Sequence, residues 1–401
     1  MNLLFLTPSL PYPPAQGTAI RNWGLISGLA LRHRVTLLTF AHPHQDIHST
    51  LRTVCARVET VPHSARKATD RLATLLFSRR PDLEDRLGSH EFYHRLRQIL
   101  TEEKFDAIHI EGLEMAPYAI AIRHSTWLDH LPRLIFDAHN AEVVIQQRAF
   151  QTDLRHPHRW PAALYSLIQL PRLRRLEQET CHIVDNVLCV SKEDAIAISQ
   201  FTTGVNPVLV PNGLFLADYD LPTSYAPLPS CSLVFSGKMD YRSNVDAATW
   251  FADEIFPHIR AHLKGDVEFV IVGKSPTKRI MDLGRHPNTT ITGYVEDVRP
   301  YLAASTVYVA PLRMGGGTRF KLLEAMALKR AIVTTTIGAE GFAVTSGREL
   351  MVADSAAEQA NIILSLLDNA NRRNQLGTQA RAFVEQYYDW SNILPALETL
   401  Y

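Results

Sequence analysis

A glycine run followed by an apolar helix with two charged residues is the feature of this sequence best suited to chemistry. The segment 313–327 reads RMGGGTRFKLLEAMA, and its later part predicts a helix, Thr318–Leu328. Glycines let backbone N–H groups approach an anion closely, and a helix N-terminus adds about half a positive charge. The residues available to such an anion are Gly315, Gly316, Gly317, Thr318 and Arg319. The stretch therefore predicts a site for a diphosphate.

Lys321 and Glu324 interrupt this otherwise apolar helix. They lie about 60° apart on a helical wheel and form one narrow polar stripe. One interpretation is a local i,i+3 ion pair, which contributes a few tenths of a kcal/mol when exposed. In the other, Lys321 helps to hold the diphosphate and Glu324 accepts both hydroxyls of a ribose. The second interpretation accounts for more of the stretch, because a buried carboxylate without partners costs several kcal/mol.

Polar residues also follow two predicted strands in the first half of the chain. Leu134–Phe136 and Ala107–Ile110 are short apolar runs typical of a parallel sheet. The polar residues at their ends are His109, Glu111, Asp137, His139 and Asn140. Ligands of open α/β sheets bind at the carboxyl ends of strands, so we expect His139 to be a site residue. The alternative is a structural residue at a strand end.

The composition excludes several classes of function. The chain of 401 residues is 46% hydrophobic and 20% charged, which is typical of a globular protein with two domains. Its 41 basic and 41 acidic residues cancel, whereas a dedicated nucleic-acid binder carries a basic excess. The four cysteines show no ligand spacing, and the histidines at 42, 44 and 48 are irregularly spaced in a loop. The DYD sequence at 218–220 has the form of a metal-binding DxD, but we attribute it to chance in a linker. We therefore expect free thiols, no metal and no cofactor.

The segment 52–80 is locally basic, with seven Lys/Arg against two acids. Its apolar residues give an amphipathic pattern, which is typical either of a solvated helix or of a helix on an anionic membrane. The N-terminus lacks the positive start of a signal peptide, and no run of about 18 apolar residues occurs. The sequence predicts a cytoplasmic protein, with peripheral contact on the inner face of the plasma membrane as the open alternative.

Alternating strands and helices would position these residues. The strand Asn2–Thr7, a proline-rich loop, a helix from Thr18 to Arg32 and the strand Val35–Phe40 form a βαβ unit. This unit sets the class as α/β with a parallel sheet. Further predicted strands of the first half are Asn186–Val190 and Val208–Val210, and a long helix is predicted at 161–181.

The turn sequence PNGLF at 211–215 marks a domain boundary, after which the pattern starts again. The strands predicted there are Ser232–Phe235, Val267–Val272, Thr289–Thr292, Val307–Ala310 and Ala331–Thr334. We expect two Rossmann-like domains, 1–212 and 213–385, which face each other across an interdomain cleft that holds the ligand. A C-terminal helix at 386–401 is expected to pack back on the first domain.

The donor-binding segment of the family 4 retaining glycosyltransferases, group 1 enzymes with the GT-B fold, resembles GGGTRFKLLEAMA followed by AIVTTTIGAEGF. Supporting segments occur in the family's order along nearly the whole chain: FDAHNAE, PNGLF, FSGKMDYRSNVDA and TGYVEDVRPYLAAS. The resemblance implies an enzyme that moves a sugar from a nucleotide diphosphate donor to a glycan or lipid-linked acceptor, with retention and without a metal. Such enzymes build cell-surface polysaccharides and glycolipids.

The same resemblance implies roles for individual residues. Glu324 corresponds to the second glutamate of the family's E-x7-E motif and would bind the donor ribose. Lys238 and Lys321 would stabilise the donor phosphates, and His139 would lie beside the transferred sugar. The remaining donor contacts that it implies are Gly17, Arg21, Arg242, Tyr294 and Val295.

Two positions depart from the family pattern. Gly316 stands where the first glutamate of E-x7-E contacts the donor sugar, and Asn244 stands near the second basic residue of the phosphate pair. We expect altered donor contacts, with Arg242 as a substitute cation. Two alternatives to a transferase stay open: a nucleotide-sugar 2-epimerase of the same architecture, and a catalytically silent subunit that binds the donor.

Overall fold

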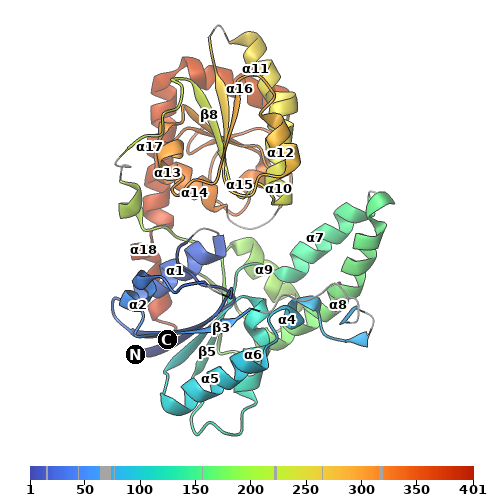
Figure 1. Ribbon diagram of the computed structural model, residues 1–401, viewed down its shortest axis with the longest axis vertical. Coiled ribbons are helices and arrows are strands. Elements are labelled where there is room, and N and C mark those ends of the chain that lie inside the picture. Colours follow the sequence, from blue (N-terminus) through green and yellow to red (C-terminus); the bar gives the residue numbers. More distant parts are fainter. Residues whose placement is uncertain are drawn as a thin grey trace. The chain divides into compact units, whose positions relative to one another are not determined.

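The computed structural model describes residues 1–401 except 15–16, 44, 64–73, 76, 156, 221–223, 264 and 316–318. The chain divides into two units, each built on its own sheet (Figure 1). Unit 1 comprises Met1–Gly213 and Ile393–Tyr401, and unit 2 comprises Leu214–Asn392. Every pair of neighbouring strands in both sheets is parallel, so the predicted α/β class is confirmed.

The sheet of unit 1 has seven strands in the order β3-β2-β1-β4-β5-β6-β7. Their bounds are β1 (Asn2–Thr7), β2 (Arg34–Ala41), β3 (Arg57–Pro62), β4 (Ala107–Glu111), β5 (Arg133–Ala138), β6 (Asn186–Cys189) and β7 (Val208–Leu209). The central strands are apolar on both faces, because helices cover both faces of the sheet. Leu4 and Ile108, for example, are fully buried. Sequence reasoning missed β3, because its residues lie inside the basic segment 52–80.

That basic segment differs from the expected amphipathic helix. Its first part is the strand β3, and Arg57 at the start of this strand forms ion pairs with Glu59 and Glu102 at 3.0 and 2.8 Å. The expectation for residues 64–73 and 76 lies outside the described residues. Thr74, Leu75 and Phe77 are helical, and the Phe77 side chain is 88% exposed.

The helices of unit 1 include α1, which follows β1, and the long pair α7 and α8, which projects away from the sheet (Figure 1). Their bounds are α1 (Gly17–Leu29), α2 (Ser49–Val54), α4 (Asp82–Arg86), α5 (His90–Glu102), α6 (Ala116–Arg123), α7 (Glu142–Leu154), α8 (Trp160–Ile183) and α9 (Lys192–Phe201). The helix α18 (Trp390–Glu398) starts in unit 2 and ends in unit 1. Gly28 of α1 contacts this helix, since a Cβ at Gly28 would collide with Leu394.

Unit 2 has a six-stranded sheet in the order β10-β9-β8-β11-β12-β13. The strands are β8 (Ser232–Ser236), β9 (Glu268–Val272), β10 (Thr289–Gly293), β11 (Val307–Ala310), β12 (Ile332–Thr334) and β13 (Met351–Val352). The α-helices are α10 (Arg242–Trp250), α11 (Phe256–His262), α12 (Lys278–Leu283), α13 (Arg299–Ala304), α14 (Phe320–Ala327), α15 (Thr336–Ala339), α16 (Ala356–Asp368) and α17 (Ala370–Tyr387). A π-helical turn, Phe251–Ile255, joins α10 to α11 in one continuous helical segment.

Backbone contacts near the boundary between the units tie the end of unit 2 to its beginning. Leu214 N donates to the Tyr388 carbonyl at 2.8 Å, and Trp390 N donates to the Leu214 carbonyl at 3.0 Å. The Trp390 side chain is 1% exposed. Residues just beyond the expected limit of 385 therefore pack within unit 2. In the described part of the chain, no helix has the length and apolar character needed to cross a membrane.

Candidate functional site

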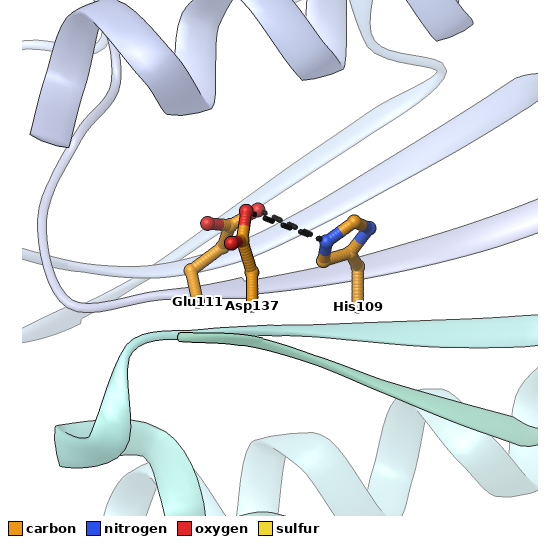
Figure 2. Close-up of side chains that lie close together, drawn as sticks. All are labelled: His109, Glu111 and Asp137. Carbon is orange, nitrogen blue, oxygen red and sulfur yellow. Dashed lines mark ion pairs between the residues drawn. The ribbon is translucent and has the colours of Figure 1, made fainter. Parts of the chain in front are cut away.

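Polar side chains gather at the carboxyl ends of β4 and β5 in unit 1 (Figure 2). The parallel register places Glu111 beside Asp137, and His109 lies two residues before Glu111 on the same strand face. His109 Nε2 lies 3.6 Å from Glu111 Oε1 and 3.8 Å from Asp137 Oδ2, and all three residues are fully buried. We call these three residues the strand-end cluster.

Arg21 of α1 closes one side of the strand-end cluster. Its Nε and Nη2 donate to the two oxygens of Asp137 at 2.8 and 2.9 Å, and Nη1 donates to the Val210 carbonyl at 3.0 Å. Although burial alone would raise the pKa of Asp137, the guanidinium holds it well below its usual range. The Arg21 side chain is 1% exposed, which differs from its expected contact with a diphosphate. Gly17, by contrast, is exposed as the first residue of α1.

His139 follows β5 and contacts the strand-end cluster through Glu111. Its Nε2 lies 2.9 Å from Glu111 Oε2. With its amide oriented to donate, Asn22 of α1 reaches the same oxygen at 2.8 Å. Burial opposes a charged ring, but the hydrogen bond to Glu111 and the charge of Asp137 raise the pKa of His139. Glu111 therefore fixes the orientation of the one histidine that the sequence singled out.

The strand-end cluster also fits the distances of a cation site. Within the described ranges, His109, Glu111 and Asp137 have ligand atoms within 4.8 Å of one another. However, Arg21 already occupies both oxygens of Asp137. His139 likewise occupies one oxygen of Glu111 at 2.9 Å. The carboxylates of the cluster thus already have partners in Arg21 and His139.

In unit 2, Lys321 on α14 meets the start of α10. Its Nζ donates to Asn244 Oδ1 at 2.7 Å and lies 4.4 Å from the centre of the Phe235 ring. Asn244 Nδ2 donates to the Lys238 carbonyl at 2.9 Å. A Cβ at Gly237 would lie 2.7 Å from Asn244 Nδ2 and 2.9 Å from Lys321 Nζ. The structure thus joins the turn after β8 to the helix that follows the glycine run.

Glu324, one turn further along α14, contacts a different partner. The Tyr219 hydroxyl donates to Glu324 Oε1 at 3.2 Å. The Arg299 guanidinium lies 5.8 Å from the centre of the Tyr219 ring. Between Lys321 and Glu324, both described, no ion pair within 4.0 Å forms. Lys321 and Glu324 therefore do not form the local i,i+3 ion pair. Instead, Glu324 accepts a hydrogen bond from a hydroxyl group.

Burial shifts both charged groups of α14 toward neutrality. It lowers the pKa of Lys321 to about 7, with the charge of Arg319 as a second cause. It raises the pKa of Glu324 to about 7, although the Tyr219 hydrogen bond acts in the opposite direction. Such shifts of the pKa toward neutrality are typical of binding sites, because a bound ligand can supply the partner that a buried charged group lacks.

The glycine run is described only at its start. Gly315 has φ +120°, a left-handed conformation that favours glycine, and a Cβ there would lie 3.2 Å from Arg319 Nη2. Arg319 precedes α14 as its N-cap residue. Gly316, Gly317 and Thr318 lie outside the described residues, so their contacts with a diphosphate stay predictions.

The other residues implied as donor contacts are placed on the surface of unit 2. Lys238 forms an ion pair with Asp240 at 3.2 Å, with both side chains partly exposed. Arg242 is exposed at the start of α10, and Tyr294 follows β10 with 73% of its surface exposed. Val295 is half-buried beside it. Their roles toward a donor stay predictions.

Sequence reasoning missed three residues of these sites: Asn22, Tyr219 and Tyr401. Tyr401 OH lies 2.7 Å from His109 Nδ1, a contact across 292 positions that no local pattern indicates. Tyr219 stands in the DYD sequence, which was considered only as a metal motif. Asn22 had a usable signal, because it follows Arg21 on the buried face of an otherwise apolar helix.

Comparison with known proteins identifies relatives of this chain. Residues 230–369 match the family of glycosyl transferases group 1. A phosphatidyl-myo-inositol mannosyltransferase of Propionibacterium freudenreichii subsp. shermanii is 27% identical over 233 residues, which are 54% of this chain and 56% of that protein. The matched segment of the family contains β8 to β13 and the helix α14, which carries Lys321 and Glu324.

Two solved structures share the fold along the whole chain. The sucrose-phosphate synthase of Thermosynechococcus elongatus superposes with a TM-score of 0.73 at 17% identity, covering 100% of this chain and 98% of that one. The HepE protein of Anabaena, in complex with UDP and glucose, superposes with a TM-score of 0.68 at 15% identity, covering 100% and 99%. These structures show the GT-B fold along the whole chain, and residues 230–369 are similar to the glycosyl transferases group 1.

Proposed function

We propose that this chain transfers a sugar from a nucleotide diphosphate donor to a hydroxyl group of a glycan or lipid-linked acceptor, with retention at the anomeric carbon. The observation that carries the proposal is the hydrogen bond from the Tyr219 hydroxyl to Glu324, at the position where the family binds ribose. A ribose hydroxyl would donate a hydrogen bond to the same carboxylate. The pathway that fits is polysaccharide or glycolipid biosynthesis.

The nucleotide half of the donor would bind to unit 2. Glu324 would accept the ribose hydroxyls, and the amides of Gly315, Gly316 and Gly317 would face the diphosphate with the side chain of Arg319. Tyr294 and Val295 would lie near the base. The HepE structure contains UDP and glucose, which makes UDP-glucose the first donor to test.

The catalytic work would be electrostatic. Negative charge builds on the diphosphate as the glycosidic bond breaks, and donors fixed before the reaction stabilise such charge without reorganising. Lys321 and Lys238 would supply positive charge, so the reaction would require no metal. The leaving phosphate would take the acceptor proton, and His139, oriented by Glu111, would position the transferred sugar.

A panel of UDP-, GDP- and ADP-sugars incubated with the purified protein tests the proposal. Nucleotide release that depends on an added acceptor supports transfer, and the anomer of the product reports retention. Conversion of the sugar without nucleotide release supports the epimerase. Binding of every ligand without turnover supports the silent subunit. Either of these last two results would reject transfer.

We also propose peripheral contact with an anionic membrane through the segment 52–80. The described end of this segment carries an exposed apolar side chain, Phe77, beside the exposed Arg79 and Arg80. An apolar side chain flanked by cations binds anionic lipid through both burial and charge. Flotation with liposomes should recover the protein only when they contain phosphatidylserine or phosphatidylglycerol. Loss of recovery in Phe77→Asp is expected, and the exposed Tyr387→Asp in unit 2 is the matched control.

A further inference from the structure

Unit 1 contains a cavity of about 210 Å³ beside His139. The segments that follow β1, β4 and β5 form it, and its polar walls are Ser9, Thr18, Glu114, Asn140 and Glu142 in addition to His139. A cavity of about 150 Å³ can hold a benzene molecule. The volume therefore suits one substituted six-membered ring and little more.

Gly112 keeps this cavity open between two of its polar walls. It has φ +83°, and a Cβ there would lie 3.0 Å from Glu114 Oε2 and 3.5 Å from His139 Nδ1. Glu111 holds the opposite nitrogen of the same ring at 2.9 Å. Because Nε2 is engaged in this way, Nδ1 is the edge of His139 that meets a ligand next to the Glu114 carboxylate.

Apart from His139, the titratable side chains that line the cavity are acidic. Glu114 and Glu142 line it, whereas no Lys or Arg does so among the residues that the structure describes. Arg86 lies 3.7 Å from Glu114 Oε1 but does not line the cavity. Burial, with the charge of Glu114, raises the pKa of Glu142 to about 7, so this acid can donate as well as accept near neutrality.

This lining has a clear preference among ligands. Sugar hydroxyls donate to carboxylates and accept from a protonated acid or an imidazole N–H. A phosphate group brings only acceptors and negative charge, and it is normally bound by arginine, lysine or helix N-termini. The Glu114 carboxylate would repel it, and the one basic side chain in the lining, His139, is already paired with Glu111.

We infer that this cavity binds an uncharged, polyhydroxylated six-membered ring at the reacting end of the acceptor, and that it rejects a phosphate-bearing group. The inference rests on the proposed function, because that function supplies the need for an acceptor. It narrows the reacting end of the glycan or lipid-linked acceptor to a neutral sugar or cyclic polyol. Any phosphate on the acceptor must lie outside this cavity.

Saturation-transfer NMR on the full chain tests this inference with matched probes. The methyl α-glycosides of glucose, mannose and galactose are compared with the corresponding sugar 1-phosphates. A nucleotide that stabilises the protein thermally is present to fill the donor site. We expect saturation transfer to at least one methyl glycoside, and sugar 1-phosphates that bind at least about tenfold more weakly because like charges face each other.

Three variants assign the signal to the cavity. Gly112→Ala should abolish glycoside binding by filling the space between Glu114 and His139, and Glu114→Gln should weaken it without the backbone strain of the first variant. Glu114→Lys should shift the preference toward the sugar phosphates. Glu91→Lys, an equal charge change at an exposed position of α5, is the control and should keep the wild-type preference.

Several results would overturn the inference: equal binding of sugar phosphates, no signal from any neutral glycoside at tens of millimolar, or glycoside binding that survives both Gly112→Ala and Glu114→Gln. Separate titrations with UDP, GDP and ADP keep the proposed function distinct. If nucleotides bind but the cavity prefers the sugar phosphates, the proposed function stands and only the specificity inferred for the cavity is rejected. If the glycosides bind but no nucleotide binds and no nucleotide sugar is turned over, the proposed transferase is rejected. The inferred ligand class of the cavity would then still stand.

Discussion

At the scale of single residues, Glu324 offers the most direct test of the donor site. Glu324→Ala should weaken nucleotide diphosphate binding by about 1–3 kcal/mol, because a charged acceptor for the ribose is lost. Titration calorimetry with the stabilising nucleotide measures this change. Tyr219→Phe removes only the hydroxyl that occupies Glu324 Oε1 in the free protein, so it should not weaken binding. A dissociation constant unchanged by Glu324→Ala would defeat the ribose assignment.

Lys321 predicts a pH dependence of donor affinity. Its pKa is about 7 in the free protein, so the ammonium that attracts the diphosphate is progressively lost as pH rises above 7. Binding of an anion raises that pKa, and linkage then requires proton uptake on binding. The dissociation constant of the nucleotide sugar should therefore rise about tenfold between pH 7 and pH 9.

Lys321→Met provides the comparison for this pH effect. The variant should bind more weakly at pH 7 and show a flatter profile up to pH 9, since it has no ammonium to lose. Proton uptake is measured directly by repeating the calorimetry in buffers of different ionisation enthalpy. A wild-type profile that keeps its slope in Lys321→Met would assign the titration to another group.

At the scale of elements, the Arg21–Asp137 pair joins α1 to β5 inside unit 1. Asp137→Asn leaves a buried guanidinium without its counter-ion and should destabilise the protein by about 3–5 kcal/mol. The double variant Arg21→Met, Asp137→Asn should recover part of this loss, because it removes both charges. Urea unfolding of the four proteins in the cycle measures the coupling. Additive losses would show that the pair is not coupled.

The pair also has a predictable pH signature. The pKa of Asp137 is lower in the folded protein than in the unfolded chain, so the unfolded chain binds more protons in acid. Its contribution to stability is present above the unfolded pKa and is lost as pH falls. The Asp137→Asn variant should consequently lose less stability than the wild type as pH falls below about 4, as measured by thermal unfolding.

The sequence predicts elements better than it predicts contacts between them. Continuous apolar runs such as Asn2–Thr7 identified the buried strands, because a strand covered on both faces has no polar side. β3 was missed, since its exposed edge position admits charged residues such as Arg57 and Glu59. His139 was recognisable from its place after a strand. The residues that orient His139 could be recognised only in part, because Asn22 and Glu111 come together through the tertiary fold.

At the scale of the whole molecule, the limits of unit 2 can be tested with fragments. The fragment 214–392 should fold and bind nucleotide, because it contains its complete sheet and the α14 site. A fragment that ends at 385 should be less stable by about 3–5 kcal/mol, since it lacks Trp390, which is 1% exposed. Thermal unfolding and nucleotide titration of both fragments measure the difference. Equal stability would place Trp390 outside the core of unit 2.

The segment Ile393–Tyr401 has a consequence for the order in which the chain folds during synthesis. It belongs to unit 1, and its last residue contacts His109 through Tyr401 OH. A ribosome delivers all of unit 2 before this segment, although domains usually fold in the order of their synthesis. Unit 1 therefore lacks the contact of Tyr401 with His109 Nδ1 until residues 393–401 have been made after unit 2. Completion of the unit that comes first in the sequence thus depends on residues that are made after the second unit.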